Sequence, residues 1–145
     1  MLIYPEFIRC LSGCVSSNTG LEDNMYIPMA ISGITVDPLT NSPIVILKAV
    51  EGDQTLPIWI GLLEATAIAS ELEGIKFSRP MTHDLFRNMM EMVEIKVLKI
   101  EVCDLKNNTY YALIHFIQGE KEMTIDARPS ERITELNSTI RRRAL

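Results

Sequence analysis

Residues 56–85 decide the fold, and they read LPIWIGLLEATAIASELEGIKFSRPMTHDL. The apolar run 56–60 has the length and composition of a buried strand, and it stops at Gly61. Residues 63–73 then repeat apolar side chains at helical spacing, which predicts a helix. Thr82 is a preferred N-cap residue, so a second helix is predicted to begin there.

Strand signals lie on both sides of this stretch. Five further segments are rich in apolar and β-branched residues and are bounded by turn formers: 29–36, 44–50, 94–105, 109–118 and 122–127. The alternation of apolar residues slips between Val97 and Ile100, which predicts a β-bulge. Asn107 and Asn108 suit the turn of a hairpin between two of these strands.

The order of these segments predicts the architecture. Three strands precede the two helices, three strands follow them, and a last helix is predicted to open at Pro129 or Ser130. This grouping is typical of a single α+β domain with a mostly antiparallel or mixed sheet. Residues 1–24 are rich in turn formers, so we expect a flexible N-terminal extension and a folded domain over residues 25–145.

The composition is that of one globular domain. The chain has 145 residues, of which 47% are hydrophobic and 23% charged, and this balance argues against disorder. No apolar run approaches the ~18 residues of a membrane span, and the first residues lack the pattern of a signal peptide. We therefore expect a cytoplasmic protein that does not enter a membrane. The three cysteines and two histidines lack the paired spacing of a zinc site, so reduced thiols are expected.

Charge is distributed unevenly along the chain. The net charge of −5 opposes binding to nucleic acid, where contacts between basic side chains and phosphates dominate the affinity. Residues 1–74 hold 2 basic and 9 acidic side chains, whereas residues 75–145 hold 12 basic and 10 acidic ones. Any surface for a polyanion must therefore lie in the second half of the chain. The same charges are also typical of an ordinary solvated surface.

Three short motifs follow one another along the chain. Residues 57–61 read PIWIG and are followed by Glu64, residues 79–85 read RPMTHDL, and residues 126–130 read DARPS. In this order and spacing they resemble the bifunctional nuclease domain family over roughly residues 29–130. The resemblance implies a nuclease that cleaves DNA and RNA. A divalent metal, magnesium or manganese, is the usual requirement for cutting phosphodiesters.

After Ser130 the chain departs from the family pattern. Glu131 stands where the family has Asp, the segment that follows is more polar than in the family, and we expect no equivalent of the family's terminal strand in residues 131–145. The domain is therefore expected to be divergent and short beyond Ser130.

The pair His83 and Asp84 is the strongest chemical candidate. A histidine beside a carboxylate at the start of a helix can act as a general base or bind a metal. The alternative is purely structural. Thr82 would cap the helix, Asp84 would interact with the helix dipole, and Arg87 lies one turn further on, where it can pair with Asp84.

A second candidate group joins Glu64 with the DARPS segment. Glu64 follows the WIG turn, and Asp126 can serve as a metal ligand or a base. Arg128 and Arg79 can clamp a phosphate, while Ser130 opens a predicted helix whose amides can bind an anion. The alternative is an ion pair of Asp126 with either arginine, since ion pairs and phosphate sites use the same parts.

Two functions are compatible with these residues. The nuclease hypothesis assigns catalysis to Glu64, His83, Asp84 and Asp126 and substrate binding to Arg79, Arg128 and Ser130, with the metal ligands unknown. The rival hypothesis is a non-catalytic module that binds a partner protein or a small anionic metabolite at the two Arg-Pro steps. A homo-oligomer, first of all a dimer, is expected. Trp59 is expected to pack in or beside the core rather than to stack on a base.

Overall fold

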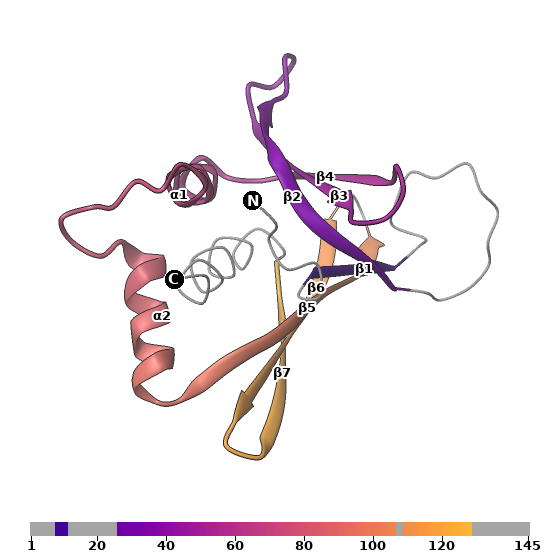
Figure 1. The fold of residues 1–145 in the computed structure, drawn as a ribbon. Coiled ribbons are helices and arrows are strands. Elements are labelled where there is room, and N and C mark those ends of the chain that lie inside the picture. Colours follow the sequence, from indigo (N-terminus) through magenta and orange to yellow (C-terminus); the bar gives the residue numbers. More distant parts are fainter. Residues whose placement is uncertain (1–7, 12–25, 107–108, 129–145) are drawn as a thin grey trace.

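The computed structural model describes residues 8–11, 26–106 and 109–128, which form one sheet and two helices (Figure 1). The elements in chain order are β1 (Ile8–Leu11), β2 (Tyr26–Val36), β3 (Pro43–Ala49), β4 (Thr55–Trp59), α1 (Leu62–Glu73), α2 (Thr82–Met92), β5 (Ile95–Lys106), β6 (Thr109–Gln118) and β7 (Lys121–Ala127). The predicted α+β class with a mixed sheet is confirmed. The predicted last helix and the turn at residues 107–108 lie outside the described residues.

Two antiparallel units and a short strand between them make up the sheet. The strand order is β4-β3-β2-β1-β5-β6-β7, so β2–β4 form one antiparallel unit and β5–β7 the other. Strand β1 pairs antiparallel with β2 and parallel with β5, and it therefore joins the two units into one mixed sheet. The two helices connect β4 to β5; α1 packs against β3 and α2 against β5 (Figure 1).

Strand β1 corrects the expectation for the N-terminal residues. Ile8 is only 2% exposed and lies opposite Met29 of β2 and Ile100 of β5, both of which are buried. The prediction that residues 1–24 lie outside the folded domain is therefore wrong for Ile8–Leu11. A strand of four residues is too short to show periodicity among turn formers, and its place comes from pairing with distant strands. The rest of residues 1–24 lies outside the described part of the chain.

Strand β4 is buried on one face only. Leu56 and Ile58 are buried, whereas Trp59 is 53% exposed, and its indole Nε1 donates a hydrogen bond to Asp37 Oδ2 at 3.1 Å. Trp59, which was expected in or beside the core, does not lie in it, because side chains alternate along a strand and Ile58 occupies the buried face. Neither helix in the described part of the chain is long and apolar enough to cross a membrane.

The bulge predicted in β5 is confirmed, and it sets which side chains reach which face. The pairing of β5 with β6 shifts between Val97 and Lys99. Before the shift Val97 lies opposite Phe116 and packs against the core; after it Ile100 lies opposite Ile114 in the core. Because side chains alternate, the extra residue turns Lys99 and the alternate residues after it onto the face away from the core. Glu101 and the polar residues that surround it, described below, lie on this face.

Candidate functional site

The start of α2 holds the predicted pair His83 and Asp84. Met81, with φ −75° and ψ 172°, is the N-cap, so the prediction that Thr82 caps the helix is wrong by one residue. Thr82 already has helical geometry, and Asp84 provides the cap interaction instead. Its Oδ2 accepts a hydrogen bond from the Met81 N–H at 3.0 Å, and its Oδ1 lies 3.1 Å from Arg87 Nη2. The predicted pairing of Asp84 with Arg87 is confirmed, which leaves this carboxylate engaged on both oxygens.

Glu64 occupies the same position in α1. It is the third residue after the N-cap Gly61, as Asp84 is the third after Met81. A Cβ atom at residue 61 would collide with Glu64 Oε2, so the carboxylate folds back over the start of its own helix. An acidic group there interacts favourably with the helix dipole. Local helix design therefore accounts for both Glu64 and Asp84, and His83 lies half-buried beside Asp84.

The two arginines and Asp126 are exposed. Arg79 lies in the loop before α2, and Arg128 directly follows β7. Within the described residues, Arg79, Arg128 and Asp126 form no ion pair with one another or with any other group. Asp126 lies on β7 opposite Leu113 of β6. Ser130 lies outside the described residues, and the binding of a phosphate by Arg79 and Arg128 stays a prediction.

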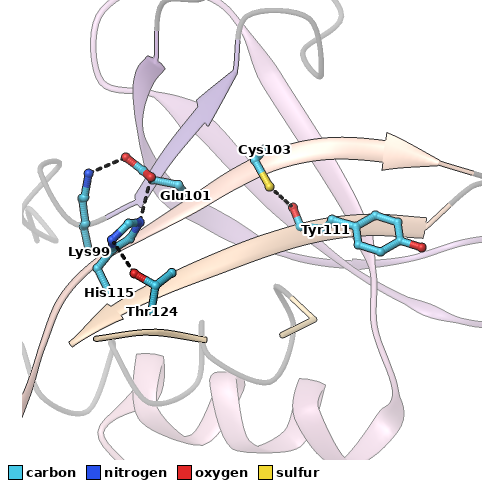
Figure 2. Close-up of polar contacts among 6 residues, drawn as sticks. All are labelled: Lys99, Glu101, Cys103, Tyr111, His115 and Thr124. Atoms are coloured by element: carbon cyan, nitrogen blue, oxygen red, sulfur yellow. Dashed lines mark hydrogen bonds and ion pairs between the residues drawn. The ribbon is translucent and has the colours of Figure 1, made fainter. Parts of the chain in front are cut away.

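A polar cluster that the motifs did not reveal lies across β5, β6 and β7 (Figure 2). Glu101 is its centre: Lys99 Nζ lies 2.5 Å from Oε1, and His115 Nε2 lies 2.8 Å from Oε2. The other ring nitrogen of His115, Nδ1, is 3.3 Å from the hydroxyl of Thr124. The register explains the grouping, because Lys99 lies opposite His115 and His115 lies opposite Thr124.

The electrostatics of this cluster centre on the Glu101 carboxylate, whose side chain is 9% exposed. Burial alone would raise the pKa of Glu101, but the hydrogen bonds from Lys99 and His115 outweigh it, so that the pKa is lowered. The carboxylate is therefore ionised at neutral pH and can only accept. The proton of a neutral His115 accordingly lies on Nε2, and Nδ1 presents a lone pair to the Thr124 hydroxyl.

Asp126 and Cys103 belong to the same face of the sheet. Thr124 and Asp126 are two residues apart on β7, so their side chains share a face at a spacing of roughly 7 Å. Burial raises the pKa of Cys103, and the negative charges of Asp104, Asp126 and Glu101 raise it further. The Cys103 thiol lies 3.5 Å from the carbonyl of Tyr111 (Figure 2). Cys103 is therefore a protonated thiol, not a nucleophile.

The sequence carried part of the signal for this cluster. The hairpin turn predicted at residues 107–108 implies that β5 pairs with β6. The predicted bulge shifts that pairing by one residue between Val97 and Lys99. A second shift, between Val102 and Asp104, was not predicted. Counted from the hairpin, this second shift alone brings Lys99 opposite His115. Without it Lys99 would lie opposite Phe116, and Lys99 and Glu101 would both lie on the face away from His115, because an extra residue exchanges the two faces.

The carboxylates predicted as metal ligands are not gathered in one place. Among residues 8–11, 26–106 and 109–128, no three His, Cys, Asp or Glu side chains form a group that could hold a metal ion. Asp84 is paired with Arg87, and Glu64 is folded over its own helix start. The side chains that the structure describes therefore do not assemble a metal centre by themselves.

Comparison with known proteins connects this geometry to a family. The family described as "Bifunctional nuclease domain" matches residues 45–135, which include α1, α2 and all three strands of the polar face. Two uncharacterized proteins of Mycobacterium tuberculosis, from strains CDC 1551 and H37Rv, are each 37% identical over 103 residues, or 71% of this chain. The chain spans 61% of the length of these relatives. With the family match covering more than half of its residues, the chain belongs to the bifunctional nuclease domain family.

Proposed function

We propose that this protein is a nuclease that hydrolyses phosphodiester bonds of DNA and RNA. The observation that carries the proposal is the family match over residues 45–135, which contains every candidate residue named above. Exposed Arg79 and Arg128, neither of them neutralised by an ion pair within the described part, support it, since free guanidinium groups are suited to bind phosphate.

The roles of individual residues are part of the proposal. Arg128 and Arg79 hold the phosphate, helped by Ser130, and Asp126 is the free carboxylate beside them in the sequence motif. His83 is the proposed base at the start of α2, beside Asp84, and Glu64 is the proposed catalytic carboxylate at the start of α1. Magnesium or manganese stays the predicted cofactor, since phosphodiester cleavage commonly depends on such an ion.

Cleavage assays with labelled single-stranded and duplex DNA and RNA test the proposal. The protein is incubated with magnesium, with manganese or with EDTA, and Asp126→Asn is compared with Asp53→Asn, an exposed acid in the turn between β3 and β4. We expect Asp126→Asn to lower the rate by at least about two orders of magnitude, because a positioned base or ligand typically contributes that much. Asp53→Asn should not change it. Equal rates for wild type and Asp126→Asn would contradict the assigned role.

A non-catalytic module is the second candidate. It is supported by the structural engagement of Asp84 with Arg87 and Met81, and by the net charge of −5. Under this proposal the protein binds a partner protein or a small anion at the exposed arginines. The distinguishing result would be no turnover with either metal, together with weaker binding of an anion such as pyrophosphate by Arg128→Ala.

We also propose where the protein is located and how it assembles. A reduced, unpaired Cys103 is typical of the cytoplasm, where we place the protein. Assembly into a homo-oligomer, first of all a dimer, is supported by exposed apolar side chains on the helices, such as Leu63 and Met92. Sedimentation of the purified chain measures its oligomeric state directly, and a monomer at micromolar concentration would contradict the dimer.

A further inference from the structure

The cluster on β5–β7 has no part in the reaction proposed above. Glu101 is a buried charged residue on the face away from the hydrophobic core, and both of its oxygens bind to side chains of that face. Burying a charge is costly unless it is paired and hydrogen-bonded. Here the pairing also orients the imidazole of His115. Its Nε2 is held by Glu101, and its Nδ1 is directed toward the exposed hydroxyl of Thr124.

The position of Thr124 indicates where a ligand can enter. Its hydroxyl lies 3.3 Å from His115 Nδ1, which is long for a hydrogen bond with an O–H donor, typically about 2.8 Å. Thr124 is exposed on β7, the last strand of the described sheet. A hydroxyl of a bound substrate can therefore replace that of Thr124 at Nδ1 without breaking the bond between His115 and Glu101.

We propose that His115 is the general base for metal-independent cleavage of RNA at this cluster, with the ribose 2′-hydroxyl taking the place of the Thr124 hydroxyl. The inference rests on the proposed nuclease function and concerns its RNA activity alone. Nδ1 takes the proton from O2′ while O2′ forms a bond to the adjacent phosphorus. The P–O5′ bond breaks, and O5′ leaves with the electron pair. The O5′ atom takes up a proton from solvent, and His115 later releases to solvent the proton that it accepted from O2′. The products are a 2′,3′-cyclic phosphate and a 5′-hydroxyl end.

Lys99 supplies the positive charge that this reaction needs. The side chain of Lys99 is 36% exposed, and the residue lies directly opposite His115 in the strand register. Its ammonium group is therefore beside the base, where it can attract a phosphate and stabilise the charge that develops on the phosphoryl oxygens. Glu101 touches no substrate atom in this arrangement. It is a positioning residue that fixes the orientation and tautomer of His115.

The need for a 2′-hydroxyl restricts this reaction to RNA. DNA has no 2′-hydroxyl, so this route is closed to it, and any cleavage of DNA must use other groups of the protein. The route also needs no metal ligand, which agrees with a cluster built from one carboxylate, one imidazole, one ammonium and one hydroxyl. RNA cleavage in EDTA is therefore the property that separates this cluster from the proposed metal-assisted site.

The experiment measures cleavage of a labelled RNA in EDTA by the full chain. We expect His115→Ala to lower the rate at least about 100-fold, the contribution of a positioned base. His115→Gln, which keeps a donor for Glu101, covers the case in which alanine disturbs the fold. The matched control is Asp104→Asn, because Asp104 also pairs with a lysine two residues along β5, at 2.7 Å. This control should cleave RNA as wild type does. Product ends should be 2′,3′-cyclic phosphates, and a 2′-deoxy substitution at the cleaved nucleotide should stop the reaction.

Glu101→Gln tests the positioning role. Its kcat should fall while KM changes little, because the amide oxygen of Gln can still accept a hydrogen bond from Lys99 while the negative charge that orients His115 is lost. RNA and DNA cleavage that both disappear in EDTA would overturn the inference and leave the nuclease function standing. RNA cleavage in EDTA at equal rates in wild type and His115→Ala would also overturn it. No cleavage of any nucleic acid under any condition would overturn the nuclease function, and this inference with it.

Discussion

Replacing Ile8 by alanine tests whether the short strand β1 is part of the folded domain. Ile8 is 2% exposed and lies between buried residues of β2 and β5. Alanine lacks three of its carbon groups, and at about 0.8 kcal/mol each their transfer to water costs roughly 2.4 kcal/mol. The cavity left in the core adds to this, so the free energy of unfolding should fall by about 2–5 kcal/mol.

Urea unfolding followed by far-UV circular dichroism measures this loss. Leu39→Ala is the control, since Leu39 is 92% exposed and should change the free energy by less than about 0.5 kcal/mol. If Ile8→Ala costs less than about 1 kcal/mol, β1 contributes little to the fold. The two halves of the sheet would then be held together by the remaining core. The expectation of a flexible N-terminal extension outside the folded domain would in that case hold for Ile8–Leu11 as well.

Three further predictions concern charged and polar groups. Asp84→Ala should lower the free energy of unfolding by about 1–2 kcal/mol, because Arg87 loses its ion-pair partner and the start of α2 loses its hydrogen-bond acceptor. The loss should stay below that of a buried ion pair, since Asp84 is 32% exposed. An unchanged midpoint of chemical unfolding would contradict this prediction. Cys103 should react with iodoacetamide more slowly than a free thiol at mildly alkaline pH, since burial raises the pKa of its thiol. Mass spectrometry of the peptide that contains Cys103 measures the rate of alkylation. Equal rates in the native and the denatured protein would refute the prediction. Because the pKa of Glu101 is lowered by folding, its stabilisation is present above the unfolded value of about 4.3 and is lost as the pH falls through the folded value. Wild type and Glu101→Gln should therefore differ in unfolding free energy at neutral pH and converge in acid, and a difference independent of pH would count against the ion pair.

The sequence alone determined the features that depend on neighbouring residues. Apolar spacing predicted α1 within one residue, and the apolar runs predicted the strands on both sides of the helices. The motifs at residues 57–61, 79–85 and 126–130 identified the family. These features are local because helix periodicity, helix ends and turns are set by residues a few positions apart.

Only the tertiary structure decided which faces and which distant residues meet. Strand β1 has its place because it pairs with β2 and β5, and Trp59 is exposed because Ile58 takes the buried face. The cluster around Glu101 requires the register shift between Val102 and Asp104 in the β5–β6 ladder, which moves Lys99 and Glu101 onto the face of His115. Register depends on long-range strand pairing, which local sequence patterns do not encode, and so the face that holds Glu101 and His115 became visible only in the folded sheet.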